Sequence, residues 1–107
     1  MAELRLDPYV LDVLMRDLAG HDRKPSAFLV FLSLWHCTIG ARVRSARLSL
    51  RQIAEATGLS KSAVQGALKH LARRKLLRVE RASPTAVPVY TLLRPWGSKR
   101  WRPGATP

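Results

Sequence analysis

Cysteine is nearly absent from this sequence, and Cys37 is the only one among 107 residues. A single cysteine excludes an internal disulfide framework and favours a reducing compartment. Long apolar runs are absent as well: the longest, 27–39, is interrupted by polar residues and is too short to span a bilayer. No basic segment followed by an apolar stretch begins the chain, so no signal peptide is expected. These absences predict a soluble, cytoplasmic domain without membrane contact.

Acidic residues become scarce after residue 22. Residues 1–22 hold five acids and two bases, a net charge of −3. Residues 23–107 hold 17 bases and only two acids, Glu55 and Glu80, a net charge of +15. Such an excess repels itself unless a polyanion is near, and nucleic acid is the commonest polyanion that proteins bind. The charge distribution therefore favours a nucleic-acid partner.

Residue sets for catalysis or metal binding are missing from the sequence. It contains no paired carboxylates, no glycine-rich phosphate loop and no Ser-His-Asp set. The histidines and the cysteine lie without ligand spacing, at His21, His36, Cys37 and His70. We therefore expect no enzyme, no metal, no cofactor and no small-molecule ligand.

The length fits one ordinary domain, and the composition divides it into three parts, 1–24, 25–93 and 94–107. In the first part, an Asp-Pro pair and Gly20 predict a helix over 8–19. Its inward stripe is expected to be Val10, Leu11, Leu14 and Leu18. Tyr9 and Val13 are apolar outside that stripe, which suggests that this helix is the contact of a twofold homodimer.

The second part begins with a helix that Pro25 opens and Gly40 closes. Apolar residues lie on nearly all of its sides, so it should occupy the middle of the core. A basic loop over 41–47 and a short strand near Leu48 are expected to follow.

Two short helices with a tight turn come next. Ser49 and Gln52 form a capping-box pattern, and Gly58 can take the positive φ that the turn needs. Ile53, Ala54 and Ala56 should form the inner face of the first helix. Ser60 should cap the second helix, which runs to about Arg74, with its apolar residues on one side: Val64, Ala67, Leu68 and Leu71.

Two β-rich runs, 76–81 and 87–93, surround a proline-containing connection and predict a hairpin. Leu77 and Val79 are expected to pair against the alternating residues Val89, Thr91 and Leu93. Pro88 should lie at a sheet edge or at the start of its strand, where it need not donate a hydrogen bond.

Residues 50–71 resemble a helix-turn-helix, with a small residue at Ala54, the turn glycine at Gly58 and an apolar residue at Leu59. Together with the hairpin, residues 25–93 are similar to the winged-helix subclass of bacterial DNA-binding regulators. The resemblance implies an α+β, mainly helical fold: a winged helix-turn-helix with a three-helix core, a β-hairpin wing and an extra N-terminal helix. Lys75 departs from the pattern, because these domains often have glycine there.

This resemblance implies sequence-specific binding of double-stranded DNA and transcriptional regulation. The expected recognition helix spans about 60–74 and the wing about 76–93. Its candidate contact residues are Ser60, Lys61, Ser62, Gln65, Gly66, Lys69 and Arg73. Backbone and wing contacts are expected from Arg51, Arg78 and Arg81. Gln65 is the best base reader, because its amide can pair bidentately with adenine.

Two other interpretations stay open at this point. Some plasmid and phage replication proteins carry the same type of module, so the chain could be the DNA-binding part of a replication or mobile-element protein. Winged helices also serve as protein-interaction modules, although the cationic face of helix 60–74 disfavours that use here. The basic 94–107 segment is expected to be a flexible tail, with Trp96 packed on the wing or, with Trp101, stacked on bases.

Overall fold

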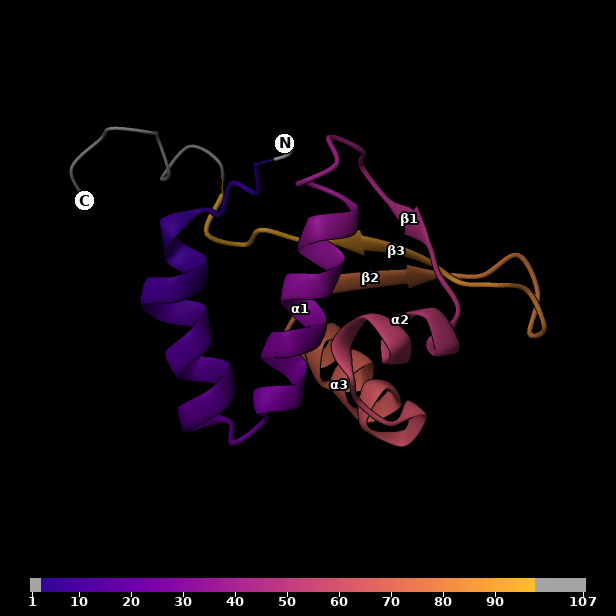
Figure 1. The fold of residues 1–107 in the computed structure, drawn as a ribbon, viewed down its shortest axis with the longest axis horizontal. Helices are drawn as coiled ribbons and strands as arrows, with labels where there is room; N and C mark the ends of the chain where they lie inside the picture. The colour runs from indigo at the N-terminus through magenta and orange to yellow at the C-terminus, as the bar shows by residue number, and fades with distance from the viewer. Residues whose placement is uncertain (1–2, 98–107) are drawn as a thin grey trace.

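A computed structural model describes residues 3–97 of the chain. It contains an N-terminal helix over 8–21, three further helices and a three-stranded antiparallel sheet within this described part. The elements follow in the order η1 (Val10–Leu14), η2 (Arg16–His21), α1 (Pro25–Cys37), β1 (Ala46–Arg47), α2 (Leu50–Thr57), α3 (Lys61–Arg73), β2 (Leu77–Glu80) and β3 (Val89–Leu92). Helices and wing give the winged helix-turn-helix with an extra N-terminal helix that the sequence predicts (Figure 1).

The N-terminal helix is wound in wide π turns over η1 and η2. Because a π turn holds more residues than an α turn, positions four apart stay in line, and Val10, Leu14 and Leu18 are buried. Leu11, expected in the same stripe, is rotated outward and 45% exposed. The helix also continues through Gly20 to His21, and the chain turns at Arg23 instead, which has a positive φ of 54°.

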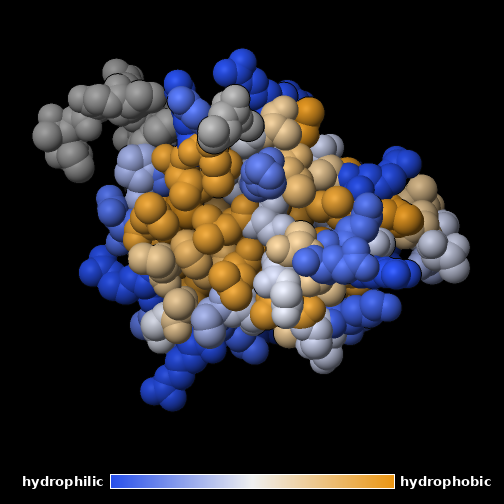
Figure 2. Space-filling model, in the orientation of Figure 1, coloured by the Kyte–Doolittle hydropathy of each residue, from blue (hydrophilic) through white to orange (hydrophobic). Residues whose placement is uncertain are grey.

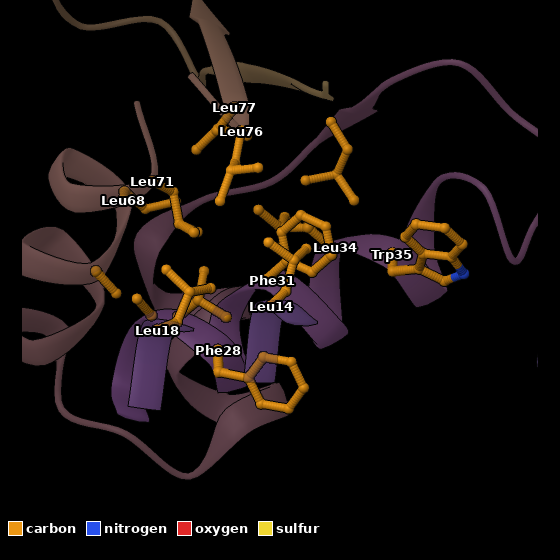
Figure 3. Packing of buried hydrophobic residues seen from close by; sticks show 14 of the residues in the cluster. Leu14, Leu18, Phe28, Phe31, Leu34, Trp35, Leu68, Leu71, Leu76 and Leu77 are labelled. Atoms are coloured by element: carbon orange, nitrogen blue, oxygen red, sulfur yellow. The ribbon is translucent and has the colours of Figure 1, made fainter. Parts of the chain in front are cut away.

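Helix α1 is the centre of the core. It packs against the N-terminal helix on one side and against α2, α3 and β3 on others. Figure 3 shows how side chains of the N-terminal helix, α1, α3 and residues 76–77 meet in one cluster around Phe31 and Leu34. α1 ends at Cys37, earlier than predicted. The backbone of Thr38 leaves the helical region (φ −117°, ψ −84°), and in the following turn the Gly40 amide donates to the Trp35 carbonyl at 2.8 Å. Neither α1 nor any other helix of residues 3–97 is long and apolar enough to cross a membrane.

The helix-turn-helix has the local geometry that its sequence predicts. The amide of Gln52 donates to the Ser49 hydroxyl, and the Ser49 amide donates to the Gln52 side chain, which completes the capping box. Gly58 ends α2 with a left-handed φ of 78°, and Ser60 caps α3. One expectation is wrong: Ala56 is exposed. Ile53 is buried, and Leu50 and Ala54 are half-buried against the core.

Lys75 takes the left-handed conformation, with a φ of 59°, in the turn between α3 and β2. Glycine is the residue that adopts this region without strain. The turn is held by two backbone hydrogen bonds, from the Lys75 amide to the Ala72 carbonyl and from the Leu76 amide to the Leu71 carbonyl. The fold therefore keeps the turn that the missing glycine would normally make, at the expense of local strain.

The sheet has the strand order β1-β3-β2, so β3 is the central strand. Leu77 lies opposite Leu92, and Val79 lies opposite Tyr90. The predicted pairing with Val89, Thr91 and Leu93 is thus wrong by one position, which places Tyr90 on the same side of the sheet as Val79. Pro88 lies at the start of β3, as one of the two expected placements, and its carbonyl accepts a hydrogen bond from the Leu48 amide.

Trp96 packs on the start of the N-terminal helix and not on the wing. Its ring stacks on Tyr9 with centroids 4.5 Å apart, and its Nε1 donates to the buried Asp7 carboxylate at 2.7 Å. The Tyr9 side chain, which the sequence suggested as part of a dimer contact, is therefore half-buried within the chain itself. The remainder of the predicted flexible tail, Trp101 included, lies outside the described residues.

Candidate nucleic-acid interface

Helix α3 divides its side chains sharply between core and solvent. Its predicted inner stripe is buried, namely Val64, Ala67, Leu68 and Leu71. All of the residues expected to contact DNA from this helix are exposed, namely Ser60, Lys61, Ser62, Gln65, Gly66, Lys69 and Arg73. Because the inner stripe fixes the rotation of α3 against α1, the polar and cationic side must project outward.

The N-terminal end of α3 favours anions. The Ser60 hydroxyl accepts a hydrogen bond from the Ala63 amide at 3.1 Å. The amides of Lys61 and Ser62 belong to the first turn, where they have no partner within the helix. No acidic residue lies in this turn, and the helix dipole adds partial positive charge there. This end of the helix is therefore suited to phosphate oxygens.

Gly66 lies in the middle of the exposed side of α3. A Cβ atom built at this position meets nothing within 4 Å. The fold itself therefore does not require glycine, although glycine lowers helix propensity by about 1 kcal/mol relative to alanine. Gly66 therefore leaves a position without a side chain on the outer surface of α3.

The three backbone and wing arginines are exposed on separate elements. Arg51 on α2 contacts the Glu55 carboxylate at 3.0 Å, with both side chains mostly exposed. Arg78 contacts Glu80 in the same manner at 3.2 Å. Arg81 makes only a long contact of 3.5 Å with the Pro84 carbonyl. Exposed ion pairs of this kind contribute little, so Arg51 and Arg78 can each exchange the carboxylate for a phosphate.

A groove of about 230 Å³ separates α3 from the wing. It is lined by Leu50, Gln65, Leu68, Lys69, Ala72, Val79, Arg81 and Tyr90. Three of the predicted site residues thus meet here, two from α3 and one from the wing. The remaining predicted residues lie elsewhere on the exposed surface of α2, α3 and β2.

Sequence reasoning missed Tyr90 as a member of this groove. Burial raises the pKa of the Tyr90 phenol, and the nearby positive charge of Arg81 acts in the opposite direction. The side chain therefore stays a neutral hydrogen-bond donor at physiological pH. The correct strand register would have revealed Tyr90. Pairing Val79 with Tyr90 places both side chains on the same side of the sheet, whereas the predicted register places Tyr90 on the other side.

An ion-pair network on the opposite side of α3 was also missed. The imidazole Nε2 of His70 lies 2.8 Å from Oδ2 of Asp22, and Nε of Arg74 lies 3.1 Å from the same oxygen. Arg74 also approaches Asp17 at 3.7 Å, and His21 contacts the second Asp22 oxygen at 3.1 Å. The hydrogen bond from His70, aided by His21 and the positive charge of Arg74, lowers the pKa of Asp22. The network ties the end of the N-terminal helix to the end of α3.

Comparison with known proteins agrees with this arrangement. A search of curated proteins and of solved structures gave no match. Residues 32–86, slightly more than half of the chain, match the model of the MarR family. The matched region runs from α1 through α2, α3 and β2 into the wing loop, and so contains the whole helix-turn-helix. The chain therefore belongs to the MarR family of winged-helix, DNA-binding transcriptional regulators.

Proposed function

We propose that this protein binds a specific sequence of double-stranded DNA and thereby regulates transcription, with α3 in the major groove and the β2–β3 hairpin beside it. The observation that carries the proposal is the outer side of α3, which is fully exposed, cationic and free of acidic residues. A helix that protrudes from a tight turn reaches base edges from such a side. Family membership supports the same interpretation.

Each exposed residue has a proposed role in that complex. Gln65 reads an adenine through its amide, and Lys61 or Lys69 approaches guanine acceptors. Ser60 and Ser62 lie at the positive end of the helix and bind phosphate. The arginines hold phosphates and fix the docking register, namely Arg51, Arg73, Arg78 and Arg81. Gly66 lets the backbone of α3 approach the DNA closely.

A twofold homodimer through the N-terminal helix is part of the proposal. Leu11 and Met15 are 45% and 43% exposed on this helix, and Leu4 just before it is 49% exposed. Figure 2 shows hydrophobic residues gathered over the N-terminal helix and α1. Because Tyr9 is covered by Trp96, the apolar surface left for a second copy is centred on Leu11 and Met15. Members of this family usually form dimers, which supports a second copy as the occupant.

Selection of bound sequences from random duplex DNA tests the proposal. We expect one motif to be enriched, and a palindrome with half-sites one helical turn apart if the dimer binds as proposed. A protein-interaction module would enrich no motif, and that outcome would refute the proposed function. A motif without symmetry would refute the dimeric mode alone.

The base-reading role is tested with Gln65→Ala on the selected site. Loss of a bidentate amide–adenine pair should weaken binding by about 1–3 kcal/mol on that site and change little on random DNA. Gln52→Ala removes a glutamine from the capping box instead and serves as the control for a merely structural effect. If Gln65→Ala weakens binding to every sequence equally, Gln65 does not read a base.

A further inference from the structure

The groove between α3 and the wing contains a polar group without a partner. Tyr90 is 1% exposed, and its hydroxyl forms no hydrogen bond with another residue of the described part. Buried tyrosine hydroxyls normally find one. Among residues 3–97, no fully buried side-chain nitrogen or oxygen lacks a partner, so solvent reaches this hydroxyl, and Tyr90 lines the groove. An acceptor bound in the groove can therefore replace the water there.

The groove also indicates the charge of that acceptor. Arg81 is close enough to Tyr90 for its positive charge to act on the phenol, and Lys69 lies on the α3 side of the same groove. A neutral donor flanked by two cations selects an anionic oxygen acceptor. No acidic residue lines the groove.

Apart from Gln65, the rest of the lining is apolar. Leu68 and Ala72 contribute from α3, and Val79, which is 38% exposed, contributes from β2. A free inorganic anion gains nothing from apolar contacts, whereas a nucleic-acid strand carries a sugar next to each phosphate. A duplex that accepts α3 in its major groove and the wing beside it must pass one backbone strand between these two elements.

We propose that this groove clamps one sugar–phosphate strand of the DNA, with the Tyr90 hydroxyl donating to a phosphate oxygen. Lys69 and Arg81 neutralise that phosphate from the two sides of the groove, which leaves Lys61 as the lysine for guanine acceptors. Leu68 and Val79 contact the adjoining deoxyribose. The clamp rests on the proposed function, because it requires α3 in the major groove. It adds a neutral, sequence-independent contact to the charged ones.

Tyr90→Phe removes only the hydroxyl and keeps the ring that the core needs. We expect about tenfold weaker binding to the selected site and to random duplex alike, because the lost hydrogen bond is made to a charged oxygen. The dependence of affinity on salt should not change, since tyrosine carries no charge, whereas Lys69→Met should flatten the log–log salt slope by about one unit. Tyr9→Phe is the matched control and should bind as the wild type does, because Tyr9 stacks on Trp96 and does not line this groove.

Methylphosphonate substitution locates the phosphate. One neutral methylphosphonate in the selected duplex should weaken wild-type binding at the clamped position, and the same substitution should weaken Tyr90→Phe much less. The clamp would be overturned if Tyr90→Phe bound DNA as tightly as the wild type. If Gln65→Ala still lost affinity only for the selected sequence, the proposed function would remain intact. A loss confined to the selected sequence would also overturn it, because Tyr90 would then read a base. Absence of any duplex binding by the wild type would instead refute the proposed function.

Discussion

The two sides of the C-terminal half of α3 carry similar cations in opposite situations. On the side that faces the N-terminal helix, His70 and Arg74 are tied to Asp22. On the outer side, Lys69 and Arg73 form no ion pair with any residue of the described part. Adjacent residues, Arg73 and Arg74, thus differ in their surroundings. Asp17 and Asp22 neutralise the side of α3 that faces the N-terminal helix (its rear), and the proposed DNA contact uses the outer side (its front).

Removal of Asp22 should have the largest effect on this arrangement. Asp22→Ala breaks the contacts with His70 and Arg74 and should lower the free energy of unfolding by about 2–3 kcal/mol. Chemical denaturation measures this free energy of unfolding. Asp12→Ala, an exposed acid on the same helix whose side chain forms no ion pair among residues 3–97, is the control and should change stability by less than about 0.5 kcal/mol. Equal effects of the two variants would show that the network does not hold the helices together.

Acid should weaken the same network. The folded state lowers the pKa of Asp22, chiefly through His70, so this group stabilises the fold above the pKa it has in the unfolded chain. That stabilisation is lost as pH falls through the lower pKa of the folded state. As pH falls below about 5, wild-type stability should therefore fall more steeply than that of Asp22→Asn. Parallel curves would contradict this role of Asp22.

The neighbouring arginines provide the most direct contrast. Arg73→Ala should weaken binding to selected and random DNA alike and flatten the log–log salt slope by about one unit, with stability unchanged. Arg74→Ala should instead lower stability by about 1 kcal/mol and leave the salt slope as it is. Salt titrations of affinity and denaturant unfolding measure the two quantities. If both variants change the salt slope, the outer side of α3 and the side that faces the N-terminal helix do not differ in DNA binding as proposed.

Gly66→Ala gives the smallest expected change in stability and separates folding from binding. Because the added methyl group meets nothing within 4 Å, the free protein should gain up to about 1 kcal/mol. Affinity for DNA should nevertheless fall, if the backbone of α3 approaches the duplex closely. Gly20→Ala is the matched control: it is also helical and open, and should stabilise the protein without any effect on DNA affinity. Unchanged affinity in Gly66→Ala would exclude a close approach there.

The sequence predicts best those features whose causes lie within a few residues. The capping pair Ser49 and Gln52, the turn at Gly58 and the cap at Ser60 are local, and all three are confirmed. The rotation of α3 also follows from its own periodicity, which is why the exposed side of the candidate site could be named in advance.

Features that depend on distant partners could not be predicted in this way. The expected strand pairing is wrong by one position because β3 begins only at Val89, after a longer loop, and the error hid Tyr90 from the candidate site. The tie between Asp22 and His70 joins residues 48 apart in the sequence. Neither residue type nor spacing signals that these two side chains meet. Long-range packing decides both, and it is the part of the fold that single-sequence patterns do not contain.

The contact between Trp96 and Asp7 joins residues 89 positions apart and bears on the order of events during synthesis. A ribosome releases the N-terminal helix first and Trp96 almost last among the described residues. Until Trp96 emerges, Tyr9 lacks its stacking partner and the Asp7 carboxylate lacks its indole donor. The first helix to be made is thus among the last to be completed. A nascent chain should carry its recognition helix in place while its acidic end is still loosely held.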